Sequence, residues 1–210
     1  MDILKKTIRV LIADDHEILR DGIVSVLSAV EEIQVAGEAD SGDMAVAMFE
    51  KLRPDVTILD LKMPGMNGIE AIKAIRCIDS DARVLALTTY QGDVLAREVM
   101  LAGASGYLLK RGMHNELVDA VMNIANGFKH ISVDVAVDLG MHVDSALLSK
   151  RELEVLDLVS DGNSNKKISA MLGVSEETIK THVKTILAKM RAKDRTHAVA
   201  IALRRGMLQV

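Results

Sequence analysis

The chain has 210 residues, enough for one large or two small domains, and its apolar runs are too short to span a membrane. Its first residues lack the apolar core of a signal peptide, and a single cysteine, Cys77, excludes an internal disulfide, so we expect a cytoplasmic protein without membrane contact. Residues 149–210 hold 12 Lys and Arg against 7 Asp and Glu, whereas residues 1–148 hold 14 against 23. The basic C-terminal third favours a nucleic-acid partner, although a solvated basic helix face gives the same imbalance.

Strand and helix patterns alternate five times along residues 1–128, which we interpret as a first domain. Short apolar runs typical of buried strands lie at residues 8–13, 33–36, 56–59, 83–87 and 106–109. Segments with one apolar face follow them, at about residues 19–30, 42–52, 69–78, 94–102 and 116–126. This alternation predicts an α/β domain in which helices cover both faces of a parallel five-stranded sheet.

The third predicted strand runs directly into Asp60, and a turn marked by Pro64, Gly65 and Gly68 follows it. Open α/β sheets bind their ligands at the carboxyl ends of the strands. Asp60 is therefore a candidate nucleophile or metal ligand held on a rigid element. The alternative is an Asp that only caps the turn.

The strand order decides which other strand ends lie beside Asp60. A Rossmann order would need Gly-x-Gly-x-x-Gly after the first strand, but Asp14 and Asp15 stand there and would repel a dinucleotide phosphate. The flavodoxin-like order 2-1-3-4-5 has its switch point between strands one and three. That order brings Asp14, Asp15 and Asp60 to one crevice.

Three carboxylates in one crevice repel each other unless a cation or proton intervenes. Oxygen ligands suit a hard cation such as Mg²⁺, which accepts phosphate oxygens readily. The fourth strand ends at Thr88 and the fifth at Lys110, which add a hydroxyl and an ammonium group. Singly, Thr88 is more often a plain strand residue and Lys110 a solvated one. Together the five side chains favour phosphoryl transfer to Asp60.

At this point a resemblance is plain: residues 8–127 resemble the receiver domain of bacterial two-component response regulators. It implies that a sensor histidine kinase phosphorylates Asp60. The segments that carry it are Asp14-Asp15, Leu59-Asp60-Leu61-Lys62-Met63-Pro64, Leu87-Thr88 and Ala102-Gly103-Ala104-Ser105-Gly106-Tyr107-Leu108-Leu109-Lys110.

The same resemblance implies roles for the residues around Asp60. Asp15, Asp60 and the Lys62 backbone carbonyl would bind Mg²⁺, with Asp14 acting through water. Thr88 and Lys110 would contact the phosphoryl oxygens.

Two further positions bear on the receiver resemblance. Tyr107 matches an aromatic residue that turns inward when Thr88 moves; an ordinary edge-strand aromatic is the alternative. Arg111-Gly112 after Lys110 departs from the family pattern, where many receivers have a cis proline, and this puts the local turn in question.

The chain loses strong periodicity after residue 128, and we place a linker at residues 129–147. Within it, residues 134–139 have the composition of a short helix that Gly140 can end.

Residues 148–210 form the second predicted domain, which is small and all-α. Ser149 and Glu152 make a capping box for its first helix, which Gly162 can end. Ser164 can cap a second helix, whose apolar residues are Ile168, Met171 and Leu172.

A tight turn at residues 173–175 leads into a third helix, capped by Ser175. Its outer face carries Lys180, Thr181, Lys184 and Thr185. Helix, glycine turn and basic helix favour a helix-turn-helix, and a plain αα-hairpin with a solvated face is the alternative.

Residues 147–208 resemble the four-helix LuxR-type DNA-binding domain, so the whole chain resembles a NarL/FixJ-type response regulator. By that likeness Lys180, Thr181 and Lys184 would enter the major groove. The same likeness implies that three more residues contact phosphates or lie on the helix surface: Lys166, Lys167 and His182. The segments that carry it are 148–152, 162–168, 172–175, 178–183 and 194–199.

The last predicted helix, capped by Thr196 and stopped by Gly206, is apolar all round. A surface helix of a small domain needs only one apolar stripe. We therefore expect Val199, Ile201 or Leu203 to pair with the same helix of a second chain, in a homodimer that reads two half-sites.

We interpret the chain as a phosphorylation-controlled, DNA-binding transcription regulator that catalyses only its own phosphoryl acceptance and loss. Two rivals remain open. A haloacid-dehalogenase-like phosphatase also uses an Asp nucleophile after a strand, but it needs a second Asp two residues later, where this chain has Lys62. A constitutive DNA binder with a vestigial receiver is the other; the intact acidic set argues against it.

Overall fold

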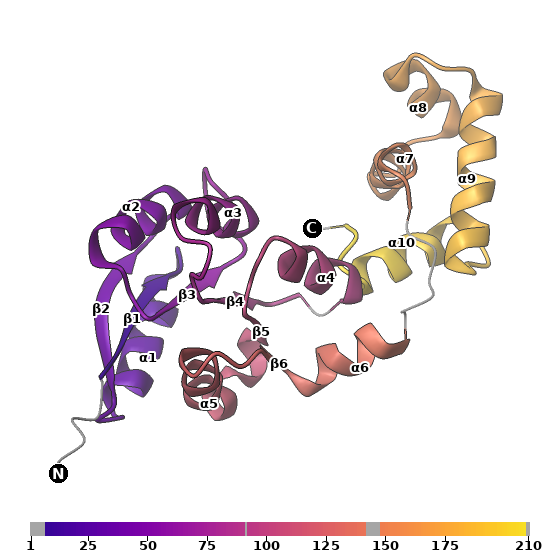
Figure 1. Cartoon of the computed structure of the whole chain (residues 1–210). Helices are drawn as coiled ribbons and strands as arrows, with labels where there is room; N and C mark the ends of the chain where they lie inside the picture. Colours follow the sequence, from indigo (N-terminus) through magenta and orange to yellow (C-terminus); the bar gives the residue numbers. More distant parts are fainter. Residues whose placement is uncertain (1–6, 91, 142–147, 209–210) are drawn as a thin grey trace, which may run out of the picture. The chain divides into compact units, whose positions relative to one another are not determined.

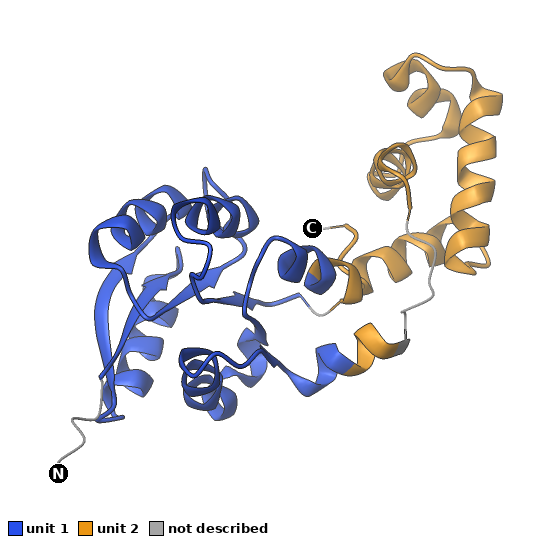
Figure 2. Ribbon diagram, in the orientation of Figure 1, with its two compact units in different colours: residues 1–90, 96–136 blue, residues 91–95, 137–210 orange. Residues whose placement is uncertain are grey.

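The computed structural model describes residues 7–90, 92–141 and 148–208. They fall into two compact units, shown in blue and orange in Figure 2. The first comprises residues 1–90 and 96–136, and the second comprises residues 91–95 and 137–210. Residues 142–147 of the predicted linker lie outside the described residues.

The first unit is built on a parallel sheet with strand order β2-β1-β3-β4-β5-β6 (Figure 1). The predicted flavodoxin-like order is confirmed, and one strand extends it beyond β5. The strands are β1 (Ile8–Ala13), β2 (Ile33–Ala39), β3 (Val56–Asp60), β4 (Val84–Thr88), β5 (Gly106–Leu109) and β6 (His130–Ile131).

Helices cover both faces of this sheet. In Figure 1, α1 and α5 lie on one side, and α2 and α3 lie on the other. The helical segments are α1 (Glu17–Ser28), α2 (Gly42–Leu52), α3 (Gly68–Ile78), α4 (Asp93–Leu101), the short 3₁₀ turn η1 (Lys110–Gly112), α5 (Met113–Ala125) and α6 (Val133–Met141).

The core between the sheet and the α1–α5 layer is apolar and closed to water. It is formed by Val10, Ile12, Ile23, Leu27, Val56, Ile58, Leu85, Leu87, Leu108, Leu117, Val121 and Ile124, each 0% exposed. Burying one such side chain fully contributes about 1.5–3 kcal/mol. This packing makes the strands rigid, and the polar residues at their carboxyl ends are therefore held in fixed positions.

Between residues 106 and 141, three predicted details differ from the structure. The predicted linker contains β6, which pairs with β5 through the registers Gly106–His130 and Tyr107–Ile131. Helix α5 begins at Met113, three residues earlier than predicted, because η1 leads straight into it. Helix α6 continues past Gly140 to Met141, since an isolated glycine weakens a helix without having to end it.

Four helices make up most of the second unit: α7 (Lys150–Ser160), α8 (Asn165–Leu172), α9 (Glu176–Met190) and α10 (Arg195–Arg204). The predicted caps Ser149, Ser164 and Ser175 each accept a hydrogen bond from the backbone three residues on. The capping box of Ser149 and Glu152 is complete, and Lys189 of α9 pairs with Glu152 at 2.7 Å.

The core of the second unit joins all four helices. Its buried members are Leu148, Val155, Leu156, Val159, Ile168, Ile179, Ile186, Met190, Ala198, Ala202 and Leu208. Two predictions fail here. Asp194 caps α10 in place of Thr196, accepting from the His197 N–H at 2.8 Å. Met171, assigned to the apolar face of α8, is 54% exposed.

Among the described residues, no helix combines the length and the apolar composition needed to cross a bilayer.

Candidate functional site

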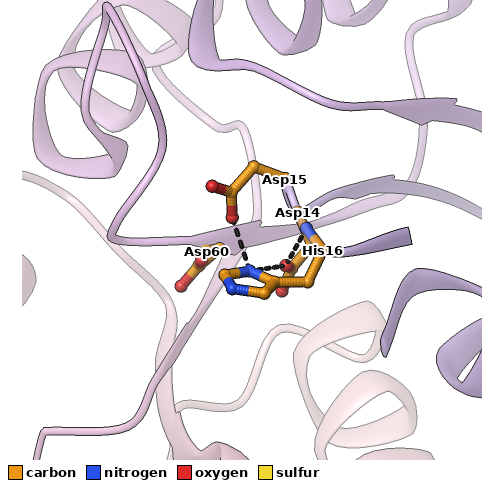
Figure 3. Close-up of side chains that lie close together, drawn as sticks. All are labelled: Asp14, Asp15, His16 and Asp60. Carbon is orange, nitrogen blue, oxygen red and sulfur yellow. Dashed lines mark hydrogen bonds and ion pairs between the residues drawn. The ribbon is translucent and has the colours of Figure 1, made fainter. Parts of the chain in front are cut away.

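Three carboxylates and one imidazole gather where β1 and β3 end. Asp14 and Asp60 are 0% and 2% exposed, whereas Asp15 and His16 reach the solvent. One ligand atom from each of the four lies within 4.8 Å of those of the others. Figure 3 shows the four side chains converging. The parallel strands β1 and β3 are hydrogen-bonded neighbours, and this pairing brings Asp14 beside Asp60, 46 residues later in the sequence.

Lys110 enters the same cluster from the residue after β5. Its Nζ lies 2.7 Å from Asp14 Oδ2 and 2.9 Å from Asp60 Oδ2, and its side chain is only 11% exposed. The alternative interpretation of Lys110, a solvated lysine, therefore does not hold. The ammonium group bridges two buried carboxylates and offsets part of their mutual repulsion. In the described residues all peptide bonds are trans, so the Arg111-Gly112 turn needs no cis bond.

The turn after β3 fixes the surroundings of Asp60. A Cβ on Gly68 would lie 2.3 Å from the Asp60 carbonyl oxygen, so only glycine lets α3 start so close to the strand end. Gly65 has a φ of 74°, in the left-handed region. The Lys62 backbone also hydrogen-bonds the Asp60 side chain. Turn capping and a chemical role for Asp60 are thus compatible.

The surroundings of Asp60 shift the pKa of its carboxyl group. Burial raises the pKa of its carboxyl group above the ordinary value, while the hydrogen bond and charge of Lys110 oppose the increase. The ionised carboxylate is consequently less favourable in the folded chain than in the unfolded one.

The Asp60→Asn variant should therefore be more stable than the parent chain near pH 7.5 in EDTA. The raised folded-state pKa means that ionised Asp60 destabilises the fold at neutral pH. This penalty decreases as the pH falls through the raised pKa and disappears below the ordinary value of 3.8, where the carboxyl is protonated in both states. We expect urea unfolding to show a gain of about 1 kcal/mol at pH 7.5 that shrinks by pH 4.5. A gain that grows with acidity would contradict this assignment.

Thr88 and Tyr107 form a buried polar pair beside the cluster. Thr88 is 1% exposed, and its hydroxyl accepts a hydrogen bond from the Tyr90 N–H at 3.1 Å. Tyr107 is fully buried and donates its hydroxyl to the Tyr90 carbonyl at 2.8 Å. Burial raises the pKa of Tyr107, and a hydrogen bond with Thr88 opposes the increase. Because β6 covers β5, Tyr107 is not an edge-strand residue.

Lys62 occupies the position where a haloacid-dehalogenase-like phosphatase needs its general acid. Its Nζ lies 3.4 Å from the Tyr90 hydroxyl and 5.9 Å from the centre of that ring. The phosphatase chemistry needs a carboxyl group at this position, and Lys62 has none. This arrangement disfavours the phosphatase alternative.

In the second unit, α8 and α9 place the predicted DNA-contacting side chains on their surfaces. Of these residues, His182 is partly buried; the exposed ones are Lys166, Lys167, Lys180, Thr181 and Lys184. Lys180 pairs with Glu177 at 3.3 Å within α9. The Thr181 hydroxyl donates to the Glu177 carbonyl.

The predicted dimer residues are all on α10. Val199, Ile201 and Leu203 are partly buried and pack against the core of the second unit. Ala198 and Ala202 make the buried stripe of this helix. The core contact therefore uses small side chains, while larger ones flank it.

Two residues near the carboxylate cluster were missed in the sequence. His16 faces the carboxylates, and the feature of the sequence that could have identified it is its position directly after Asp14 and Asp15. Tyr90 provides a main-chain acceptor and a ring near Lys62, and its only signal was its position two residues after Thr88.

The donor set fits a hard divalent cation. Asp14, Asp15 and Asp60 offer carboxylate oxygens, the ligands that Mg²⁺ prefers, and they are close enough to share one ion. The loop that holds the Lys62 carbonyl adjoins Asp60 in sequence.

Comparison with known proteins agrees with this geometry. Residues 10–122 match the response regulator receiver domain, and residues 146–202 match the bacterial regulatory proteins of the luxR family. The chain is therefore a response regulator of the family that joins a receiver domain to a LuxR-type DNA-binding domain, and it regulates transcription.

Relatives over the full length support the same family. The transcriptional regulatory proteins YxjL and LiaR of Bacillus subtilis are 38% and 39% identical, over 98% and 96% of this chain and 99% of each relative. The solved complex of the two-component response regulator RcsB with DNA has a TM-score of 0.72 at 28% identity, covering 94% of this chain and 98% of that one.

Proposed function

We propose that Asp60 accepts a phosphoryl group from a sensor histidine kinase and that this controls DNA binding in the cytoplasm. The observation that carries the proposal is the pairing of buried Asp60 with Lys110 at 2.9 Å, in the cluster with Asp14. A carboxylate held beside a cation at a strand end is positioned for covalent phosphoryl transfer.

Asp15, Asp60 and the Lys62 carbonyl would hold Mg²⁺, with Asp14 acting through water. The ion, when bound, neutralises charge on the phosphoryl oxygens. An Asp60 carboxylate oxygen attacks the phosphorus, and the bond from phosphorus to the kinase histidine nitrogen breaks. Its electron pair stays on that nitrogen.

The new aspartyl phosphate adds about −1.5 to −2 charges to the crevice. Its oxygens would be bound by Lys110, which already contacts Asp60, and by the hydroxyl of Thr88 at the end of the neighbouring strand β4. Moving Thr88 would disturb its hydrogen bonds with Tyr90 and Tyr107. Tyr107 also accepts, through its carbonyl, a hydrogen bond from Ser132 just after β6. A movement of Thr88 would therefore be transmitted through Tyr107 to the segment that leads out of the receiver domain.

For DNA, Lys180, Thr181 and Lys184 would enter the major groove, because they lie on the exposed face of the second helix of a helix-turn-helix. Lys166, Lys167 and His182 would contact phosphates or remain on the helix surface. The RcsB relative was solved with DNA, which supports this assignment. Paired half-sites would need a homodimer, formed on phosphorylation.

The direct test treats the whole chain with beryllofluoride and Mg²⁺ and measures both its mass in solution and its affinity for promoter DNA. We expect monomers to become dimers, with DNA binding at least tenfold tighter. A constitutive DNA binder would show neither response.

Removing Asp15 should abolish metal binding and leave a folded receiver domain. Without metal, Asp15→Ala should unfold at a slightly higher temperature, because one repelling carboxylate is gone. With Mg²⁺ the parent chain should gain several degrees and the variant should gain none. An equal Mg²⁺-induced shift in both proteins would exclude Asp15 as a ligand.

A further inference from the structure

Residues 92–95, at the start of α4, belong to the second unit, which also contains α10 (Figure 2). Within that unit they contact the end of α10. The Asp93 carboxylate accepts two hydrogen bonds from the Arg205 guanidinium group, one from Nε at 2.9 Å and one from Nη2 at 2.7 Å. The two side chains are only 2% and 8% exposed, so solvent screens this bidentate ion pair little.

The main chain takes part in the same contact. The Val94 N–H donates a hydrogen bond to the Arg205 carbonyl at 3.3 Å. A Cβ on Gly92 would lie 2.3 Å from the carbonyl carbon of Arg205, so glycine is needed for the two backbones to approach this closely. Leu95 is 3% exposed, and a Cβ on Gly206 would lie 2.9 Å from the Leu95 Cβ. An ion pair, a backbone hydrogen bond and close packing therefore hold one short segment to the end of α10.

The position of this segment in the sequence connects it with the proposed phosphorylation site. Asp93 follows Thr88 by five residues, and the Thr88 hydroxyl accepts a hydrogen bond from the Tyr90 N–H at 3.1 Å. A movement of Thr88 toward the aspartyl phosphate would therefore shift Tyr90, two residues before Gly92. Because Gly92 lies against the Arg205 backbone without room for a methyl group, a small shift of this segment is enough to disturb the contact.

We propose, on the basis of the proposed function, that the contact between residues 92–95 and Arg205 keeps the unphosphorylated chain monomeric and that phosphorylation of Asp60 breaks it. Helix α10 is the helix that we expect to pair with its copy in a dimer. When its end is held by Arg205, it is not free to align with a second chain about a two-fold axis. The predicted DNA-contacting face of α9 is exposed in the same structure, so the contact restrains dimerisation and leaves the DNA-reading helix uncovered.

The test measures the self-association of the whole, unphosphorylated chain by sedimentation. Asp93→Asn and Arg205→Gln each remove one charge of the pair, and each should lower the dissociation constant of the dimer at least tenfold. The two substitutions change the net charge in opposite directions, so a shared effect cannot come from net charge. The matched controls are Asp119→Asn in the receiver domain and Arg191→Gln in the second unit. They make the same changes at exposed positions and should leave the dissociation constant unchanged.

A ¹⁹F NMR titration with beryllofluoride and Mg²⁺ supplies a second readout. If the contact favours the unphosphorylated form, its loss must tighten the binding of this phosphoryl analogue through the same coupling. We expect at least a fivefold gain in affinity in both variants, whereas a general loss of packing would weaken the binding. The double variant Asp93→Asn/Arg205→Gln leaves no unpaired buried charge, so it serves where a single variant fails to fold. Its effect should equal that of the single variants, because both act through one pair.

Two results would separate this proposal from the proposed function. Variants that stay monomeric, or that bind beryllofluoride with the affinity of the parent chain, overturn the restraint, while dimerisation of the parent chain with beryllofluoride still supports phosphorylation of Asp60. A parent chain that does not bind beryllofluoride overturns the proposed function. The self-association of the variants without beryllofluoride then decides on the restraint alone.

Discussion

Replacing Asp60 by Asn is expected to abolish phosphorylation of the chain by acetyl phosphate and Mg²⁺. The amide keeps the shape of the side chain, and the apolar strand that carries it is unchanged, but it has no carboxylate oxygen to attack phosphorus. Phosphate-affinity electrophoresis should show the shifted band in the parent chain and none in the variant.

Asp40→Asn is the matched control for this experiment. Asp40 directly follows β2, at the same edge of the sheet as Asp60, but it is exposed and lies outside the cluster of possible metal ligands. It should be phosphorylated like the parent chain. A normal band in Asp60→Asn, or its loss in Asp40→Asn, would move the phosphoacceptor away from Asp60.

Strands and helices were predicted correctly where apolar residues recur with the regular spacing of a strand or a helix. The β-branched run at 56–59 and the apolar stripe around Ile23 and Leu27 predicted a strand and a helix, and both are buried as expected. Strand β6 was missed because it has two residues, His130 and Ile131, and a two-residue strand has no period. Only pairing with β5 makes it a strand.

Helix ends were predicted less well because capping candidates compete. Asp194 and Thr196 both have side chains that cap helices, and both stand near the start of α10. Backbone geometry decided between them: Asp194 has an extended conformation and accepts from the His197 N–H. Composition alone contains no information on that choice.

The composition of the candidate site was predictable because a parallel sheet aligns its strand ends. Asp14, Asp60, Thr88 and Lys110 were all found by that rule. Their mutual contacts were not predictable, since side-chain rotamers decide them. The sequence did not indicate that Lys110 bridges two carboxylates or that Tyr107 donates to the Tyr90 carbonyl.

Helix α10 is where the expected effect on DNA binding is largest. Successive residues of a helix lie about 100° apart, so Ala198 and Ala202 define a buried stripe with Val199 and Ile201 on its flanks. Leu203 lies furthest from that stripe of the three predicted dimer residues. We therefore expect Leu203 to make the main contact with the same helix of a second chain.

Glu in place of Leu203 should leave a folded monomer, whereas Glu in place of the fully buried Ala202 should unfold the second unit, because it buries an unpaired charge. The Leu203→Glu monomer should bind a single half-site as the parent does. It should lose at least 100-fold in affinity for the paired site, since the two half-site contacts are no longer linked. Circular dichroism and sedimentation separate unfolding from dissociation, and gel-shift titrations measure both DNA affinities. If folded Leu203→Glu still binds the paired site as a cooperative dimer, and Val199→Glu and Ile201→Glu do the same, α10 is not the dimer interface.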